Sequence, residues 1–215
     1  MFVTVPPVVR ARRELVEASK ELARRDPAFR PVVEAVGPCT LRSRRPPTSD
    51  FGQLAASIVY QQLAGRAAAA IHARFTALFD GPPTADAVLA LPVEALRAAG
   101  LSGAKAASVR DLAEKVRDGV VELDRIGRLG DDDVVRELTT VRGIGRWTAE
   151  MFLMFQLGRV DVWPVDDYGV RKGYARLHSL DPLPKPRELA AMGERYRPFR
   201  SVAAWYCWRA VDTQL

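Results

Sequence analysis

Helical periodicity extends over almost the whole chain. The stretch 10–24 places its apolar residues on one side at a spacing of three or four and its charges on the other, as in an amphipathic helix. The only strand-like piece is Cys39–Arg42, which is too short to build a sheet. The sequence therefore predicts an all-α fold with about ten helices.

Capping residues and helix breakers mark where these helices begin and end. Pro27 follows a capping Asp26, Gly100 and Gly158 are helix terminators, and further N-caps are expected within 46–50 and at Thr84, Ser102 and Asp131. After a short helix that begins at 26–27, the remaining helices are expected over about 51–60, 66–79, 92–99, 102–118, 131–139, 146–156, 166–178, 187–196 and 201–211.

Composition excludes several classes of protein. The 215 residues carry a net charge of +6, and none of their apolar runs approaches the ~20 residues needed to cross a bilayer. Two cysteines are too few for a disulfide framework, a four-cysteine zinc site or an iron–sulfur cluster. We expect a cytoplasmic protein with one sizeable core and room for two small lobes, and its charge permits an acidic partner without requiring one.

The segment Gly143-Ile144-Gly145 lies between a short predicted helix and a longer one. Two glycines allow a tight turn whose N–H groups point outward at the positive end of the next helix, which is a suitable place for a phosphate group. Arg146 and Thr148 could add a charge and a hydroxyl to that contact. A glycine-rich turn that only joins two helices explains the same residues and would be preferred if the motif stood alone.

A pair of aspartates, Asp166 and Asp167, follows 21 and 22 residues after Gly145. An aspartate in the first turn of a helix is stabilised by the helix dipole, so an N-cap is the simplest interpretation of either one. We assign Asp166 to the cap. Asp167 is separated from the glycine turn by one short helix, and a carboxylate near bound nucleic acid is repelled unless it has a chemical role. We therefore select Asp167 as the functional carboxylate.

Five ordered segments together carry a resemblance to a known family: Ile58–Ala68, Leu96–Ala106, the glycine turn through Ala149, Trp163–Arg171 and Arg197–Trp208. They resemble the helix-hairpin-helix DNA glycosylase superfamily, and particularly its alkyl-base branch, that of DNA-3-methyladenine glycosylase II. The resemblance implies two packed lobes with the active-site cleft between them. It makes residues 51–215 the glycosylase domain and residues 1–50 an N-terminal extension packed on this core, or a shortened N-terminal lobe.

The resemblance also implies a partner, double-stranded DNA containing a damaged base. The damaged nucleotide must swing out of the stack before its C1′ atom can be reached, and a side chain must fill the space it leaves. Gln62 is the best candidate for this wedge and Leu63 is the next. A polar helix end and a core leucine explain these two residues equally well. The DNA backbone would be held by Gly143, Gly145 and the residues Arg142, Arg146 and Thr148.

Family members bind a monovalent cation at the hairpin through backbone carbonyl groups. In this chain the carbonyls would be those of Thr139, Val141 and Ile144, and the ion, Na⁺ or K⁺, would be bound only in the presence of DNA. A positive ion there links the hairpin to a phosphate without side-chain chemistry. We expect no other cofactor to be required.

Loss of a base builds positive charge on the sugar, and a carboxylate below C1′ stabilises this charge and can activate water. The aspartate that the family uses for this matches Asp167. An alkylated purine is itself cationic and is suited to an aromatic pocket. The residues at pocket positions are Trp147, Trp208, Tyr60 and Met151. Core packing remains the alternative for the two tryptophans and is the preferred interpretation of Trp163 and Trp205.

Bifunctional relatives attack C1′ with a lysine two residues after the second hairpin glycine, where this chain has Trp147. Without that amine no Schiff base can form at this position, so we expect no strand cleavage. The leading hypothesis is a monomeric, nucleoid-associated glycosylase that hydrolyses the bond to alkylated purines, chiefly 3-methyladenine. The alternatives are the same reaction on deaminated or etheno purines and a non-catalytic helix-hairpin-helix DNA-binding protein.

Overall fold

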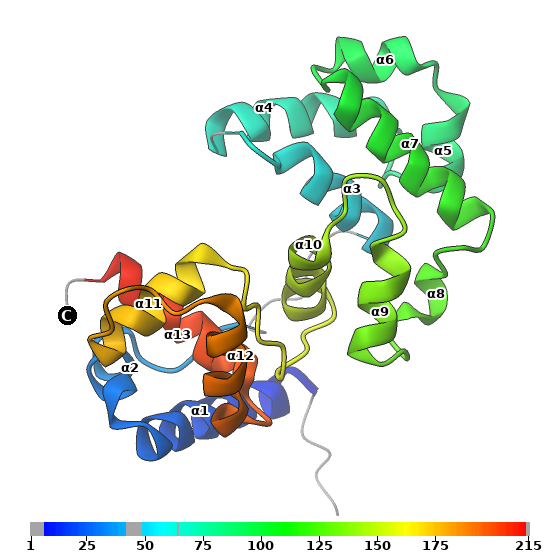
Figure 1. Cartoon of the computed structure of the whole chain (residues 1–215). Coiled ribbons are helices and arrows are strands. Elements are labelled where there is room, and N and C mark those ends of the chain that lie inside the picture. The colour runs from blue at the N-terminus through cyan, green and yellow to red at the C-terminus, as the bar shows by residue number, and fades with distance from the viewer. Residues whose placement is uncertain (1–6, 42–48, 64, 214–215) are drawn as a thin grey trace, which may run out of the picture. The chain divides into compact units, whose positions relative to one another are not determined.

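The computed structural model describes residues 7–41, 49–63 and 65–213, and these form helices joined by loops (Figure 1). The chain divides into two compact units. Unit 1 comprises Met1–Arg45 and Leu157–Leu215, and unit 2 is the continuous segment Pro46–Gln156. The expected boundary lay between residues 50 and 51 and separated an N-terminal extension from all the rest. In the structure the first 45 residues instead share a unit with the C-terminal segment.

The helices of unit 1 come from both ends of the chain. They are α1 (Pro7–Arg25), η1 (Pro27–Phe29), α2 (Arg30–Val36), α11 (Tyr168–His178), α12 (Pro186–Gly193), η3 (Glu194–Tyr196) and α13 (Arg200–Asp212). The helices of unit 2 are α3 (Asp50–Tyr60), α4 (Gly65–Thr76), α5 (Ala85–Ala90), α6 (Val93–Ala98), α7 (Gly103–Arg117), α8 (Leu123–Ile126), α9 (Asp131–Leu138), α10 (Arg146–Met151) and the π-helical turn η2 (Phe152–Gln156).

The all-α prediction is confirmed for the described residues. The predicted helix ranges omitted α8 and also α5, for which only the cap at Thr84 was predicted. The strand-like piece forms no strand at 39–41, as expected for a segment too short to build a sheet, and Arg42 lies outside the described residues. Ser49, Thr84 and Ser102 cap their helices as expected. The cap expected at Asp131 is wrong: Gly130 is the N-cap, and Asp131 begins the helix.

In unit 1 the core is built where α11 lies against α13 (Figure 1). A side chain at Gly173 of α11 would collide with the backbone carbonyl of Cys207 in α13, so glycine permits this close approach of the two backbones. Tyr206 and Cys207 are fully buried beside this crossing. The apolar face of α1 and the buried Phe29 complete the core of the unit.

A buried carboxylate joins the N-terminal segment to the C-terminal half of unit 1. Asp26, which is 4% exposed, accepts hydrogen bonds from the Tyr196 hydroxyl at 2.6 Å and from Nε2 of His178 at 2.8 Å. The His178 ring stacks on Tyr174 with 4.0 Å between ring centroids. Burial by itself would raise the pKa of Asp26, but the hydrogen bonds from Tyr196 and His178 outweigh burial and hold the pKa below its ordinary value.

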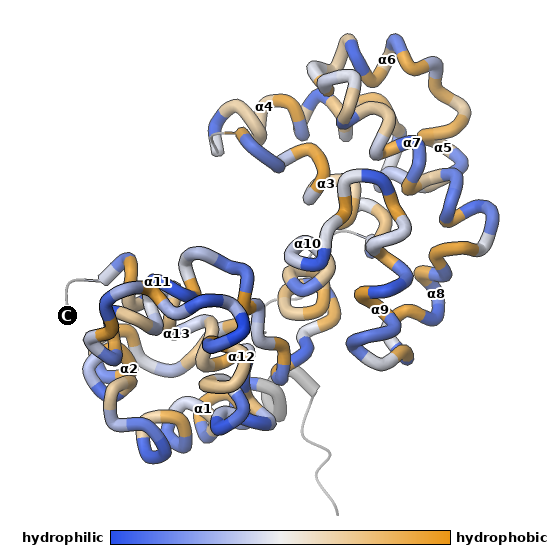
Figure 2. The backbone as a smooth tube through the Cα atoms, in the orientation of Figure 1, coloured by the Kyte–Doolittle hydropathy of each residue, from blue (hydrophilic) through white to orange (hydrophobic). Residues whose placement is uncertain are grey.

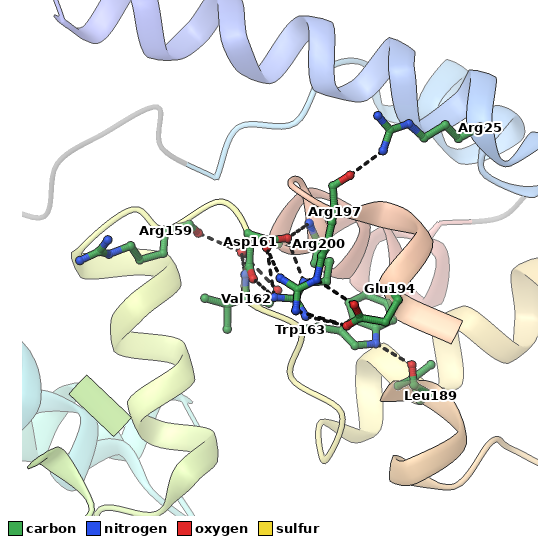
Figure 3. A network of polar contacts seen from close by, with 10 residues as sticks. Arg25, Arg159, Asp161, Val162, Trp163, Leu189, Glu194, Arg197 and Arg200 are labelled. Atoms are coloured by element: carbon green, nitrogen blue, oxygen red, sulfur yellow. Dashed lines mark hydrogen bonds and ion pairs between the residues drawn. The ribbon is translucent and has the colours of Figure 1, made fainter. Parts of the chain in front are cut away.

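A second polar network fixes the loop that precedes the aspartate pair. Figure 3 shows Arg197 and Arg200 converging on Asp161, at 2.7 and 2.9 Å from its carboxylate oxygens. The hydroxyl of Ser201 donates to the carbonyl of Arg159 at 2.9 Å and accepts the N–H of Val162 at 2.8 Å. These bonds tie residues 159–162 to the start of α13, in the same unit that carries Asp167.

Unit 2 has its own core, formed by the buried faces of its helices. The largest fully buried side chains include Leu54, Ile58, Phe75, Leu96, Leu112, Ile126, Leu138 and Leu153. Apolar and polar residues alternate along the helices of both units (Figure 2). Accordingly, across 7–41, 49–63 and 65–213, no helix is long and apolar enough to span a membrane.

The Asp26 network predicts an acid-dependent loss of stability. Because the folded pKa lies below the unfolded value of about 3.9, the contribution of this carboxylate is present above that value and is lost as the pH falls through the folded pKa. We expect Asp26→Asn to destabilise the protein by about 1 to 3 kcal/mol at neutral pH. Thermal unfolding monitored by circular dichroism should show the gap in Tm narrowing as the pH falls below about 4.

Asp212→Asn is the matched control, because Asp212 forms an exposed pair with Arg209 one helical turn away. Such pairs contribute little, so its Tm should stay close to that of the wild type at every pH. A gap for Asp26→Asn that stays constant down to strongly acid pH would contradict the assignment.

Candidate functional site

Asp167 is held at the start of α11 by two N–H donors. Its Oδ1 atom accepts the backbone N–H of Val170 at 2.8 Å, which makes Asp167 the N-cap of the helix. The same oxygen accepts the indole N–H of Trp208 from α13, also at 2.8 Å. The residue is 9% exposed. Its carboxylate therefore has a fixed orientation next to an aromatic ring.

Two glycines of α11 bring Asp167 and Trp208 together. Gly169 lies next to the indole, and a Cβ atom there would be 2.8 Å from Cδ1 of Trp208 and 3.1 Å from Oδ1 of Asp167. Gly173, one turn later, allows the backbone of α13 to approach closely at Cys207. Small residues four positions apart on one helix face are the sequence signal that could have indicated this arrangement.

The roles predicted for the aspartate pair require one correction. The N-cap assigned to Asp166 is wrong, because Asp167 is the residue that caps α11, and Asp166 is exposed. The backbone of Asp167 is extended, so its side chain turns back onto the first N–H groups of the helix. Tyr168, which the sequence analysis did not select, is 63% exposed directly beside this carboxylate in the chain.

In unit 2, the glycine turn is the predicted hairpin between α9 and α10. Gly143 has a φ of +79°, which an L side chain rarely adopts, and Ile144 is buried between the two helices with 4% of its surface exposed. The N–H of Ile144 donates to the carbonyl of Val141 at 3.1 Å, and Gly145 is the N-cap of α10. The chain thus turns at Gly143, and α10 begins directly after Gly145, as the hairpin prediction requires.

Helix α7 packs against this hairpin. A Cβ atom on Gly143 would lie 2.7 Å from Oγ of Ser108, so the turn is packed directly on α7. Oδ2 of Asp111 accepts the backbone N–H of Arg142 at 2.7 Å, and Oδ1 accepts Nζ of Lys115 at the same distance. Burial would raise the pKa of Asp111, but these contacts with Lys115 and Arg142 outweigh burial and lower it. The carboxylate remains ionised and anchors the turn.

The predicted DNA-backbone residues around the hairpin differ in exposure. Arg142 and Arg146 are exposed. Nε of Arg146 donates to the buried Glu150 at 2.9 Å, and 59% of the Arg146 side chain is nevertheless accessible to solvent. Thr148 is only 6% exposed, so it has little surface for a phosphate contact. The arginines and the glycine turn therefore provide the accessible part of the predicted set.

The predicted wedge residues lie in the turn after α3. Gln62 is exposed and has a φ of +55°, the left-handed conformation that non-glycine residues adopt infrequently. Leu63 is 39% exposed, which excludes the alternative that it is a core leucine. Tyr60, the last residue of α3, is 43% exposed, and its ring centroid lies 5.6 Å from that of His72.

The four residues predicted to surround the base belong to different units. Trp208 is partly buried and accompanies Asp167 in unit 1, whereas Trp147, Tyr60 and Met151 belong to unit 2. Trp147 is 46% exposed, so it is not a core residue. Among the other tryptophans, Trp163 is buried as predicted and donates to the carbonyl of Leu189 at 2.8 Å, while Trp205 is partly exposed.

The predicted cation ligands are backbone carbonyls of the hairpin region. The carbonyl of Val141 accepts the N–H of Ile144 and retains a second lone pair. Carbonyl oxygens are hard donors, the kind that alkali cations prefer, so Thr139, Val141 and Ile144 have suitable chemistry. Outside the residues that the structure leaves undescribed, no group of three or more His, Cys, Asp or Glu side chains could hold a metal ion.

Comparison with known proteins identifies the family. Residues 55–198 match the HhH-GPD superfamily of base excision DNA repair proteins. This segment covers more than half of the chain and contains both the hairpin and Asp167. The protein therefore belongs to the HhH-GPD superfamily.

Individual relatives are similar over nearly the full chain. DNA-3-methyladenine glycosylase 1 of Schizosaccharomyces pombe is 33% identical over 198 residues, which cover 91% of this chain and 87% of the relative. A solved structure of the 3-methyladenine DNA glycosylase of that yeast, in complex with abasic DNA, has a TM-score of 0.80 and covers 92% of this chain and 97% of its own. A DNA-3-methyladenine glycosidase from Bacillus halodurans is 32% identical with a TM-score of 0.78, covering 99% of this chain and 92% of its own.

The two hairpin glycines should respond differently to substitution. Gly143→Ala forces a side chain into a left-handed conformation and against Ser108, and we expect it to lower the free energy of unfolding by about 1 to 3 kcal/mol. Gly145→Ala is the matched control, because Gly145 has a φ of −94° and no atom within 4 Å of an added Cβ. Urea unfolding should show a much smaller change for it, and equal losses would contradict the described hairpin.

Proposed function

We propose that this protein is a monofunctional DNA glycosylase that hydrolyses the N-glycosidic bond of alkylated purines, chiefly 3-methyladenine. The observation that carries the proposal is the carboxylate of Asp167, fixed at the start of α11 and hydrogen-bonded to the indole of Trp208. The names of the yeast and Bacillus relatives support the same reaction class and substrate.

Asp167 has the properties that this reaction requires. When the bond between C1′ and the purine nitrogen breaks, its electron pair leaves with the base and positive charge develops on the sugar. A carboxylate oriented by two N–H donors stabilises this charge without having to reorganise. Water then adds to C1′, and Asp167 orients it and accepts its proton. An alkylated purine is already cationic, so no separate acid is needed to release it.

Trp208 gives the substrate preference a physical basis. Its N–H is directed to Asp167, and its ring is an electron-rich surface beside the carboxylate. The cation–π attraction between a cationic base and such a ring contributes about 0.5 to 2 kcal/mol. We propose that Trp147, Tyr60 and Met151 also contact the base, and the exposure of the first two is consistent with this role.

The hairpin and the turn after α3 supply the proposed DNA contacts. Gly143 and Gly145 of the glycine turn are exposed, as are Arg142 and Arg146, so a phosphate can approach their N–H and guanidinium groups. Gln62 is the proposed wedge, with Leu63 beside it. The carbonyls of Thr139, Val141 and Ile144 would hold Na⁺ or K⁺, which contributes a positive charge at the phosphate. We further propose that the protein acts as a monomer.

A non-catalytic DNA-binding role is the second candidate, because Asp167 also serves as the helix cap. Deaminated and etheno purines are the alternative substrates within the same reaction class. Release of each base from oligonucleotides that carry one defined lesion distinguishes these substrates from 3-methyladenine.

Asp167→Asn separates the catalytic role from the capping role. Asparagine retains an oxygen that can accept both N–H groups and is itself a good N-cap, so the substitution removes mainly the charge. We expect base release from methylated duplex DNA to fall by about two orders of magnitude or more, while affinity for the duplex is retained. Single-turnover release and fluorescence anisotropy measure the two quantities.

Asp166→Asn is the matched control for this experiment, since the neighbouring carboxylate is exposed and does not cap the helix. It should release base at close to the wild-type rate. An unchanged rate for Asp167→Asn would reject the catalytic role and favour the non-catalytic candidate.

The absence of a lysine at position 147 predicts a product that retains an intact strand. After base release, the DNA should migrate uncut on a denaturing gel and break only after treatment with alkali. Borohydride, which reduces a Schiff base to a stable bond, should trap no protein on the DNA. A borohydride-dependent covalent complex would show that another amine performs lyase chemistry.

A further inference from the structure

The exposed turn after α3 has an unusual backbone conformation that must be held in place. Gln62 adopts a φ of +55°, and this conformation is unfavourable for a residue with a side chain. It persists where neighbouring contacts enforce it. The contacts of the neighbouring Gln61 are therefore a candidate for what holds this conformation.

Gln61, the C-cap of α3, makes a contact with a distant part of the chain. Its side-chain Nε2 donates a hydrogen bond of 2.9 Å to the backbone carbonyl of Gly143, which is 82 positions away. The bond therefore links the turn that carries Gln62 directly to the glycine of the hairpin. Both elements lie in unit 2.

Helix α7 contacts the chain near Gln61 and at Gly143, the two partners of this bond. Nζ of Lys105 donates to the carbonyl of Val59, near the end of α3, at 2.6 Å, and burial lowers the pKa of this lysine. Three positions after Lys105, Ser108 packs against Gly143, and six positions after it, Asp111 accepts the N–H of Arg142. One face of a single helix thus positions the end of α3 and the hairpin, and Gln61 closes the connection between them.

We infer that Gln61 is a positioning residue that sets the place of the wedge relative to the phosphate-binding hairpin. The inference rests on the proposed function, because it assigns a mechanical step to the same site. When the hairpin holds the DNA backbone, the hydrogen bond from Gln61 fixes the distance at which Gln62 enters the base stack. Gln61 itself need not touch the damaged base.

This role predicts which step depends on Gln61. Binding of undamaged duplex uses the hairpin amides and the arginines, and these remain when the Gln61 amide is lost. Opening of the base stack requires the wedge to be in place, so that step should slow. A residue that only supported the fold of the hairpin would instead weaken binding and base release together.

Gln61→Met tests the inference, because methionine has a similar length and cannot donate to the carbonyl of Gly143. With methylated duplex DNA, we expect single-turnover base release to fall about tenfold, the effect of losing one hydrogen bond. The fluorescence of 2-aminopurine next to the lesion, which rises when the stack opens, should increase less than with wild type. The Kd for undamaged duplex should change by less than about twofold.

A substrate with a broken stack provides the rescue. When the lesion lies opposite an abasic site, the wedge has less to displace, so the deficit of Gln61→Met should shrink to about twofold or less. Gln53→Met, the same substitution earlier in α3, is the matched control and should behave as wild type on both substrates. The inference would be overturned if Gln61→Met and wild type gave equal fluorescence and equal base release. It would also be overturned if Gln61→Met bound duplex DNA more weakly and lost the same factor in base release on both substrates.

The outcomes also separate this inference from the proposed function. Wild-type protein that opens the stack but releases no base would contradict the proposed function, while the comparison of fluorescence between wild type and Gln61→Met would still decide the role of Gln61. Wild-type protein that releases base without opening the stack would overturn the positioning role alone. Wild-type protein that does neither would overturn both.

Discussion

The close approach of α11 to α13 is the constraint on which the candidate catalytic group depends. Gly173 allows the two helix backbones to meet at Cys207, and Gly169, one turn earlier, leaves room for the indole of Trp208. With larger residues at these positions, α13 would move outward and Trp208 would no longer reach the carboxylate. Helix packing in unit 1 therefore determines the geometry of two polar atoms that are 2.8 Å apart.

Asp167 combines a structural and a proposed chemical role in one side chain. The N–H of Val170 fixes the carboxylate from its own helix, and Trp208 fixes it from a neighbouring one. A side chain held from two directions loses little freedom when a substrate arrives, which is the advantage of a preorganised site. The helix cap is thus compatible with the proposed catalytic role.

Local patterns in the sequence predicted most of the helices and the hairpin, because periodicity, caps and glycines act over a few residues. The sequence singled out Asp167 as the functional carboxylate, which stays a prediction, but gave the helix cap to its neighbour, since the choice of cap depends on the backbone conformation of a single residue. The bond from Gln61 to Gly143 could not be predicted, because it joins residues 82 positions apart. Contacts of this kind follow from packing, which a single sequence does not reveal.

The division of the chain has a consequence for how the protein is made. Unit 2 is one uninterrupted stretch, so all its helices have been synthesised before residue 157 is added. Unit 1 combines segments from before and after unit 2, and Asp26 can meet His178 and Tyr196 only after these two residues have been synthesised. The unit that carries the hairpin can therefore fold first, and the contact between Asp167 and Trp208 forms later.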